Sequence, residues 1–152
     1  MHQSQQIAVG RQLFEYIDNR STAKVEGVYR QPTEEYTCPT RASLERQIFF
    51  REYPLCVGMT GLLPDPGAYR THDLSGIPIL LTRGADNKIR AFLNVCRHRG
   101  SRIAETCGSS RSFVCPYHAW TYGLNGDLIS RPEESSFTDA PKTLHGLTQL
   151  PA

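Results

Sequence analysis

The sequence lacks the features that would place the chain in a membrane or on a nucleic acid. No stretch of its 152 residues approaches the roughly 20 apolar residues that a transmembrane helix needs. The N-terminal segment, residues 1–6, has no basic and then apolar signal-peptide pattern. The formal net charge is only +2, which is too small to indicate a nucleic-acid partner. We therefore expect a chain that binds neither a membrane nor a nucleic acid.

The sequence also lacks internal repeats and a cysteine pattern typical of disulfides. A chain of 152 residues without repeats can bury one compact core but little more. Of its five cysteines, three have no obvious pairing partner: Cys38, Cys56 and Cys107. Unpaired thiols are typical of a reducing compartment, so we expect a cytoplasmic location.

Hydrophobic periodicity divides the chain into a helical beginning and a β-rich remainder. Two helices are predicted, over residues 4–19 and 41–52, with an irregular linker between them. Short β-rich runs follow at residues 55–59, 67–73, 77–83, 88–95, 120–124 and 127–130. The Asn125-Gly126 pair between the last two runs predicts a hairpin. The predicted fold class is mainly β, an antiparallel β sandwich or barrel preceded by one or two N-terminal helices. We expect a helix and linker over residues 1–40 and the β domain over residues 41–152.

Two short clusters of metal-binding residues carry the chemistry of the chain. Cys96 and His98 form the first cluster, Cys115 and His118 form the second, and sixteen residues separate the two. This pattern suits a two-iron, two-sulfide centre in which two cysteines bind one iron and two histidines bind the other. The alternative is a zinc site, because zinc takes the same donor atoms. Zinc motifs usually pair cysteine with cysteine and histidine with histidine, so the mixed clusters favour iron and sulfide.

The same motif predicts how such a centre carries an electron. Two neutral imidazoles in place of two thiolates remove negative charge, so adding an electron costs less Coulomb energy than in an all-cysteine cluster. The histidine-bound iron is the natural site for that electron, with its imidazoles facing outward. We therefore expect His98 and His118 to form the electron exit and the contact with a partner.

The residues around both clusters resemble a known family. Residues 92–100 (Phe-Leu-Asn-Val-Cys-Arg-His-Arg-Gly) and 113–122 (Phe-Val-Cys-Pro-Tyr-His-Ala-Trp-Thr-Tyr) are similar to the N-terminal Rieske domain of aromatic-ring-hydroxylating oxygenase alpha (large) subunits. Residues 44–53 and 62–69 resemble the entry into that domain. In the predicted fold the two motifs lie on two cluster-binding hairpin loops at one end. One departure is Ala119, where the family often has glycine, and it narrows the backbone conformations of the second loop.

Respiratory-chain Rieske proteins are the nearest alternative with the same cofactor. They have an extra cysteine in each loop and a serine two residues after the second histidine, whereas this chain has Tyr117 before that histidine and Trp120 at the serine position. Without a hydroxyl that donates to a sulfide, the reduced cluster is less stabilised, so we expect a potential below zero. Tyr122 has two open interpretations, a donor to a cysteine sulfur or a packed core aromatic. Tyr117 and Trp120 are expected to shield the cluster from water.

Three arginines surround the first cluster in the sequence. We expect Arg97, Arg99 and Arg102 to steer an acidic electron donor, with ordinary surface charge as the alternative. Arg97 also belongs, with Tyr117, Trp120 and Tyr122, to the predicted environment of the cluster. His72 and His145 lack metal-binding neighbours in the sequence and are not expected to bind a metal.

The resemblance implies a second metal that this chain does not contain. Oxygenases of this kind bind a mononuclear Fe(II) through two histidines and a carboxylate. After His118 the chain offers only His145, so we expect the catalytic domain to be missing from this chain and the chain to have no catalytic residue. Alone it should bind a [2Fe-2S] cluster and transfer electrons. The alternatives are a self-standing Rieske-type ferredoxin and, more weakly, a structural or regulatory domain that lost its cluster.

The expected partners follow from the same resemblance. The electron donor would be a reductase that uses NAD(P)H, in some systems acting through a ferredoxin. The acceptor would be the catalytic iron of a neighbouring alpha subunit, with a carboxylate linking it to His118. A small beta subunit is a further candidate partner. The parent reaction implied by the resemblance is insertion of dioxygen into an aromatic ring.

Overall fold

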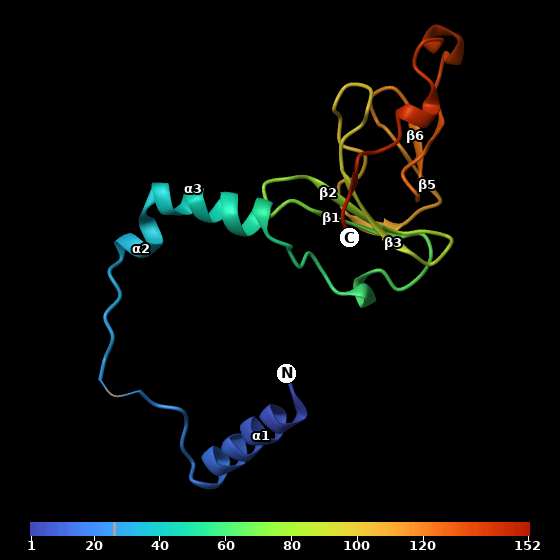
Figure 1. Cartoon of the computed structure of the whole chain (residues 1–152). Coiled ribbons are helices and arrows are strands. Elements are labelled where there is room, and N and C mark those ends of the chain that lie inside the picture. The colour runs from blue at the N-terminus through green and yellow to red at the C-terminus, as the bar shows by residue number, and fades with distance from the viewer. Residues whose placement is uncertain (26) are drawn as a thin grey trace. The chain divides into compact units, whose positions relative to one another are not determined.

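The computed structural model describes residues 1–25 and 27–152, and the chain forms two compact units, Met1–Arg41 and Ala42–Ala152. The first unit begins with α1 (Gln3–Asp18), which agrees with the helix predicted over residues 4–19 (Figure 1). None of the residues of α1 is buried, so its apolar side chains remain exposed. None of the helices in the described part of the chain combines the length and the apolar character needed to cross a bilayer.

The linker and second helix differ in detail from the prediction. A short helix, α2 (Glu34–Thr37), lies in the expected irregular linker, and α3 (Pro39–Gln47) begins at a proline. Proline is tolerated there because the first residues of a helix have no intrahelical partner for their N–H groups. The predicted helix continues only as a π-helical turn, η1 (Ile48–Glu52). Together α3 and η1 cover residues 39–52, so the helix predicted over about residues 41–52 is confirmed and begins two residues earlier than expected.

The strand predicted over residues 55–59 was wrong. These residues have no regular secondary structure and lead into a 3-10 turn, η2 (Thr60–Leu62). Their alternating apolar residues fit a strand pattern, but Val57 packs against the face of the large sheet instead of pairing along an edge. Residues 55–59 therefore pack on the face of the large sheet and do not add a strand to it.

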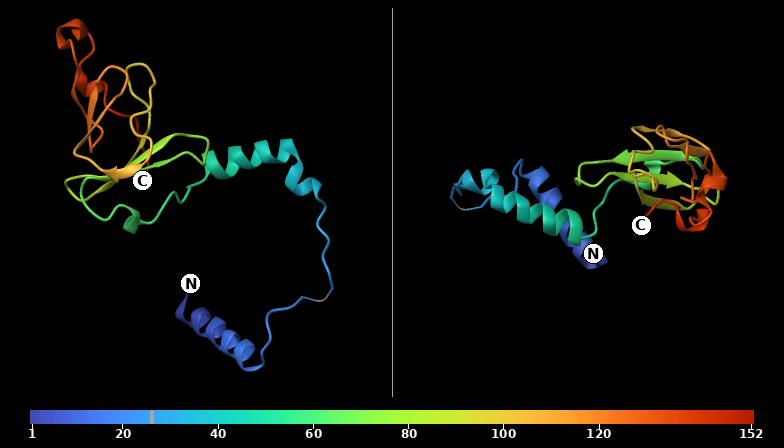
Figure 2. Two further views of the ribbon diagram at one scale, coloured as in Figure 1. Left: turned by 180° about the vertical axis from the view of Figure 1, so that it is seen from behind. Right: turned by 90° about the horizontal axis from the view of Figure 1, so that it is seen from above.

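The β domain consists of two antiparallel sheets (Figures 1 and 2). The larger sheet has the strand order β4-β1-β2-β3-β8 and the smaller has the order β5-β6-β7. The strands are β1 (Ala68–His72), β2 (Ile79–Arg83), β3 (Ile89–Leu93), β4 (Cys107–Ser109), β5 (Ser112–Val114), β6 (Thr121–Gly123), β7 (Leu128–Ser130) and β8 (Gln149–Leu150). The mainly β, antiparallel prediction is confirmed. Strands β4, β5 and β8 were not predicted; they have only two or three residues, and they lack a flanking turn signal such as the Asn125-Gly126 pair that marks the equally short β6 and β7.

The central strands β2 and β3 of the large sheet have buried residues on both faces, and each face packs against a different cluster of apolar side chains. Leu80 of β2 and Phe92 of β3 belong to the main core together with Tyr122 of the small sheet. The neighbouring residues Leu81 and Ala91 point to the opposite face and pack with Leu63 and Val57. Because side chains alternate along a strand, two adjacent apolar residues serve two faces. This explains why β2 and β3 each contain three consecutive apolar residues, at 79–81 and 91–93.

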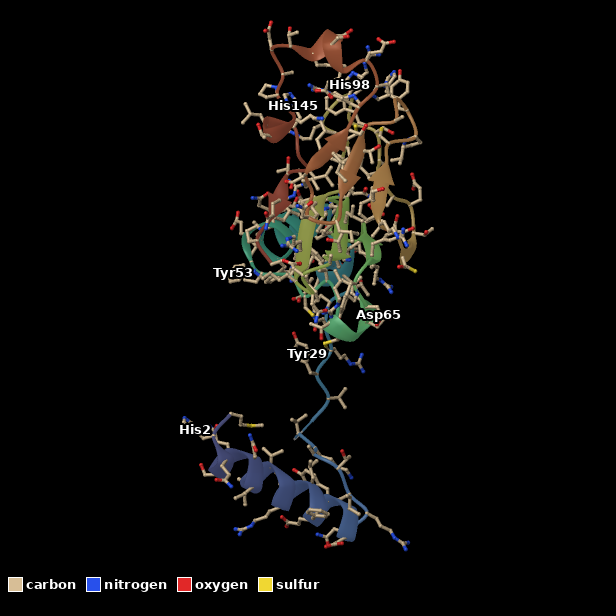
Figure 3. All side chains as sticks on the ribbon, turned by 90° about the vertical axis from the view of Figure 1, so that its right-hand side faces the viewer. His2, Tyr29, Tyr53, Asp65, His98 and His145 are labelled. Carbon is tan, nitrogen blue, oxygen red and sulfur yellow. The ribbon has the colours of Figure 1, made fainter. Side chains whose placement is uncertain are left out.

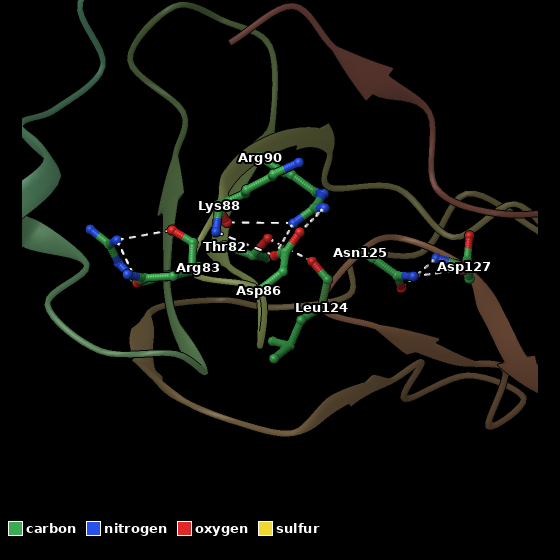
Figure 4. A network of polar contacts seen from close by, with 9 residues as sticks. Thr82, Arg83, Asp86, Lys88, Arg90, Leu124, Asn125 and Asp127 are labelled. Carbon is green, nitrogen blue, oxygen red and sulfur yellow. Dashed lines mark hydrogen bonds and ion pairs between the residues drawn. The ribbon is translucent and has the colours of Figure 1, made fainter.

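The hairpin turns are held by polar contacts that also join the two sheets (Figure 4). Asp86 accepts hydrogen bonds from both terminal nitrogens of Arg90, at 2.8 and 2.7 Å, in the turn between β2 and β3. The buried Thr82 hydroxyl donates to the carbonyl of Leu124 at 2.8 Å. Gly126 has φ 87°, and a Cβ at that position would lie 2.4 Å from the ring of Phe92. The hairpin predicted from Asn125-Gly126 is therefore confirmed, and it needs glycine because its tip lies on the core.

Two 3-10 turns lie in the segment between β7 and β8: η3 (Glu134–Phe137) and η4 (Lys142–Leu144). In Figure 1 this segment extends beyond β6, away from β1, β2 and β3. The side chain of Phe137 in η3 packs against the main core. The segment therefore adds a cap to the end of the domain that holds the two motif loops.

Candidate metal centre

The two motifs lie on loops with the same backbone hydrogen bonds. Loop 1, residues 96–101, follows β3, and loop 2, residues 115–120, joins β5 to β6. The N–H of Cys96 donates to the carbonyl of Ser101 at 2.8 Å, and the N–H of Cys115 donates to the carbonyl of Trp120 at 2.8 Å. Each cysteine carbonyl also accepts, at 3.0 Å, a hydrogen bond from the N–H four residues later. The chain therefore turns in the same way twice, once at each motif.

In both loops the fourth residue after the cysteine has a left-handed backbone conformation. Gly100 has φ 76° in loop 1, and Ala119 has φ 55° in loop 2. A left-handed backbone is free for glycine but costs a residue with a Cβ roughly 1–2 kcal/mol. Ala119, which stands where the resembling family often has glycine, is therefore the residue of loop 2 with the left-handed backbone conformation.

The side chain of a buried asparagine links the two ends of loop 1 by hydrogen bonds. Asn94 is fully buried, and its side-chain amide donates to the carbonyl of Ala104 at 2.7 Å. Its side-chain oxygen accepts hydrogen bonds from the backbone N–H groups of Ile103 and Ala104, both at 3.1 Å. The side chain of Asn94 thus forms three hydrogen bonds to the backbone across the base of loop 1.

The structure brings the four predicted ligands together at one end of the β domain. The two thiols are buried and belong to the main core, while the two imidazoles are half-buried. The rings of His98 and His118 lie edge to face, with their centroids 4.7 Å apart. The Nδ1 atom of each ring is buried and has no hydrogen-bond partner among the residues that the structure describes. Buried polar atoms normally have a partner, so two neighbouring unpaired nitrogens are available for metal coordination.

The donor set fits a two-iron cluster better than a single ion. No group of three or more His, Cys, Asp or Glu side chains within residues 1–25 and 27–152 is arranged to hold one metal ion. A tetrahedral zinc site needs four donors around one point, whereas each iron of a [2Fe-2S] centre with mixed ligands takes only two side chains. The cysteines lie on the inner side and the histidines on the outer side, as the motif predicts for two unlike irons.

The electrostatics of the site favour the ligand forms of its side chains. Burial by itself would raise the pKa of the Cys115 thiol, but backbone hydrogen bonds from Tyr117 and His118 outweigh it and hold the pKa below its usual value. Burial lowers the pKa of His98, and the neighbouring His118 and Arg99 act in the same direction. Thiolate and neutral imidazole are the forms that bind metals, so both shifts reduce the cost of coordination.

Tyr122 lies in the core and also reaches a cysteine sulfur. Its ring is fully buried, and its hydroxyl oxygen is 3.3 Å from Sγ of Cys96. The same oxygen accepts a hydrogen bond from the backbone N–H of Arg97 at 3.0 Å. Burial and the hydrogen bond to Cys96 raise the pKa of Tyr122, so the phenol keeps its proton. Since the oxygen already accepts from Arg97, its proton is free to point at the sulfur.

Aromatic side chains cover the histidines unequally. Trp120 is 3% exposed and stacks on His98, with ring centroids 4.9 Å apart and planes 5° from parallel. Tyr117 lies against His118 at 3.8 Å between centroids, but it is 58% exposed. His145 meets the edge of Trp120 at 6.0 Å, and Figure 3 shows it at the same end of the domain as His98. The ring that packs on His98 is thus buried, whereas the ring that packs on His118 is exposed.

The remaining predicted residues lie at the surface. Arg97 and Arg99 are exposed beside His98, whereas Arg102 forms an ion pair with Asp73 at 2.9 Å. Only the first two therefore keep an uncompensated charge next to the motif. Cys56 and Cys107 are exposed, with no disulfide to either.

Three residues near the site were not predicted from the sequence. Asn94 carried a signal, because it is a polar residue inside the apolar run Phe92–Val95 and short polar residues in such runs often bind backbone. Arg131 and Phe137 carried none. They lie more than ten residues beyond the second motif, and only the path of the segment after β7 brings them to Trp120.

Comparisons with known proteins agree with this geometry. Residues 54–149 match the family model described as the Rieske [2Fe-2S] domain. The chain is 41% identical over 124 residues to the glycine betaine monooxygenase oxygenase subunit of Chromohalobacter salexigens, covering 80% of this chain and 27% of that protein. It is 40% identical over 109 residues to the large oxygenase component of the 2,4-dinitrotoluene dioxygenase system of a Burkholderia species, covering 70% and 24%. The chain thus spans about a quarter of the length of these curated relatives.

Solved structures give the same assignment. A quaternary ammonium Rieske monooxygenase, studied for carnitine oxidation by gut microbiota and inter-subunit electron transfer, superposes with a TM-score of 0.72 at 31% identity, covering 79% of this chain and 33% of that one. The naphthalene 1,2-dioxygenase of a Rhodococcus species superposes with a TM-score of 0.70 at 28% identity, covering 75% and 27%. With the family match over residues 54–149, these likenesses show that the chain belongs to the Rieske [2Fe-2S] domain family.

Proposed function

We propose that Cys96, His98, Cys115 and His118 hold the [2Fe-2S] cluster and that the chain is the electron-transfer part of an oxygenase large subunit. The observation that carries this proposal is the pairing of two buried thiols with two buried, unpaired imidazole nitrogens. When bound, such a cluster accepts and releases one electron at a time. The relatives reported above are oxygenase subunits, which supports this interpretation over a self-standing ferredoxin.

The outer surface of the two imidazoles is the proposed exit for the electron. The Nδ1 atoms face inward, so the Nε2 atoms of His98 and His118 are left for a partner. A hollow of about 590 Å³ lies beside these rings, lined also by Tyr117 and Pro132. A carboxylate on the partner could accept a hydrogen bond from His118 and lead to a mononuclear iron in the catalytic domain of a neighbouring subunit.

The proposed electron donor is a reductase or a ferredoxin, and the proposed location is the cytoplasm. Arg97 and Arg99 give the first loop a positive surface that would attract an acidic donor. The five cysteines form no disulfide in the described part of the chain, which suits a reducing compartment. The relatives' names include both a quaternary ammonium compound and aromatic compounds, so we propose an oxygenase reaction without naming the substrate.

Reconstitution of the chain with iron and sulfide under anaerobic conditions tests this proposal. We expect two irons and two sulfides per chain, a visible spectrum of the Rieske type, and an EPR signal only after reduction. A redox titration should give a midpoint below zero. A colourless protein with one zinc per chain would contradict cluster binding, and a stoichiometric cluster that no reductase or ferredoxin can reduce would contradict the electron-transfer role.

A further inference from the structure

A buried arginine lies next to the aromatic rings that pack on His98. Arg131 directly follows β7, and the residue is only 5% exposed. It is the only charged residue among those buried in the described part of the chain. Burying a guanidinium costs several kcal/mol unless it is well paired. Its position therefore needs a physical account.

Arg131 contacts His98 through two aromatic rings. Its guanidinium carbon lies 4.6 Å from the ring centroid of Phe137 and 5.5 Å from that of Trp120. Phe137 meets the rings of His98 and Trp120 edge to face, at 6.1 and 5.5 Å. Trp120 is itself stacked on His98. Contacts between a cation and the faces of aromatic rings fix the rings and keep the charge close to them.

The charge of Arg131 is only partly compensated. Its Nη2 atom pairs with Glu134 at 2.9 Å and donates to the carbonyl of Phe137 at 3.3 Å. Its Nε and Nη1 atoms are buried, and no described residue forms a hydrogen bond with either of them. Glu134 is half exposed and also pairs with Lys142 at 3.5 Å. Two cations thus share one carboxylate, so the group formed by Arg131, Lys142 and Glu134 carries one positive charge in excess.

The charge of Arg131 changes the pKa of the neighbouring Glu134 carboxylate. Arg131 beside Glu134 holds the pKa of that carboxyl below its usual range, with a smaller contribution from Lys142. Glu134 is therefore ionised at neutral pH, and the three groups form a fixed charge cluster. Because Arg131 is buried, solvent screens it much less than it screens the exposed Arg97 and Arg99.

We propose that Arg131 is a positioning residue that raises the reduction potential of the Rieske cluster, acting on its histidine side through Trp120 and Phe137. This inference rests on the proposed ligand set. A reduced cluster carries one more negative charge than an oxidised one, and a buried, undercompensated cation favours the more negative state. In this chain Arg131 would offset part of the loss of the serine hydroxyl that Trp120 replaces.

Redox titration of the reconstituted protein and three variants tests the inference. Arg131→Met keeps the length of the side chain but removes its charge, and its midpoint should shift to more negative values. Arg131→Lys keeps the charge and should retain most of the wild-type midpoint, even if lost packing makes it less stable. Glu134→Gln removes the counter charge and should shift the midpoint in the opposite direction, to more positive values.

EPR and visible circular dichroism of each variant separate a charge effect from a change in ligation. Unchanged spectra with midpoints shifted in opposite directions support the inference. Shifts of the same sign in Arg131→Met and Glu134→Gln, or no shift in either, would overturn it and leave Arg131 a packing residue. If Arg131→Met does not fold, the sign of the Glu134→Gln shift alone decides. A wild-type chain that binds no cluster would instead overturn the proposed function.

Discussion

Loop 1 and loop 2 have the same backbone turn but are held in place by different means. In loop 1 the support comes from outside the loop, from Asn94 at its base and from the hydroxyl of Tyr122, which reaches both Cys96 and Arg97. In loop 2 the support is local. The Cys115 thiol is surrounded by N–H groups of its own loop, and aromatic rings pack on the histidine side.

The two loops also differ in the number of residues between the cysteine and the histidine, although their backbone turns are the same. The histidine is the second residue after cysteine in loop 1 and the third in loop 2. Two identical loops would place their imidazoles in the same way, whereas the different offsets bring the two rings face to edge at 4.7 Å. Each loop then needs its own supports because its side chains point differently. The following substitutions test that division.

Removal of a thiol should have the largest effect, and it should be equal in the two loops. Cys96→Ala and Cys115→Ala each leave one iron with a single protein ligand, so we expect complete loss of the cluster in both. Iron and sulfide analysis with visible spectra measures this. The matched controls are Cys56→Ala and Cys107→Ala, which remove exposed thiols and should leave a full cluster. A cluster that survives in either loop variant would contradict the ligand assignment.

Asn94→Ala should damage loop 1 and leave loop 2 intact. The change removes three hydrogen bonds and leaves two buried N–H groups without a partner, which we expect to cost about 3 kcal/mol of unfolding free energy. Urea unfolding of the cluster-loaded protein measures the loss. Asn125→Ala, which changes an exposed residue, is the control and should cost less than about 1 kcal/mol. Equal losses in the two variants would mean that Asn94 does not brace the loop.

The sequence predicted the site better than the supports around it. The four candidate ligands could be selected because metal chemistry requires particular residue types at short spacings within each loop. Strands β1, β2, β3, β6 and β7 could be predicted because turn residues, such as those at 64–67, 84–87 and 125–126, separate their β-rich runs. Arg131 could not be predicted, because its role depends on where the segment after β7 packs. The strand expected over residues 55–59 failed for the same reason, since pattern alone does not distinguish covering a sheet from joining it.

Tyr122→Phe should have a smaller effect that is again confined to loop 1. It leaves the Arg97 N–H without its partner and removes the proton directed at Cys96, so we expect a loss of about 1.5 kcal/mol in unfolding free energy. A donor to a ligand sulfur stabilises the reduced cluster, so the midpoint potential should also become more negative. Tyr69→Phe is the control, because no hydrogen bond of the Tyr69 hydroxyl is observed in the described part of the chain. A midpoint that stays at the wild-type value would show that Tyr122 is only a packed core aromatic.

Substitutions at the left-handed residues, Gly100 and Ala119, should change the unfolding free energy least. They also compare the two loops most directly. Gly100→Ala puts into loop 1 the residue that loop 2 already has, and nothing lies within 4 Å of the added Cβ, so backbone strain alone should cost about 1 kcal/mol. Ala119→Gly relieves the corresponding strain in loop 2 and should stabilise the protein by about 0.5 kcal/mol, because the freer unfolded chain offsets part of the gain. Thermal or urea unfolding measures both variants.

The double variant, Gly100→Ala with Ala119→Gly, exchanges the two residues between the loops. If the loops are independent, its change in unfolding free energy should equal the sum of the two single changes. A clear departure from that sum would mean that strain in one loop is transmitted to the other through the shared cluster. Repeating the measurement without the cluster then locates the coupling, because it should vanish if the cluster is the connection between Gly100 and Ala119.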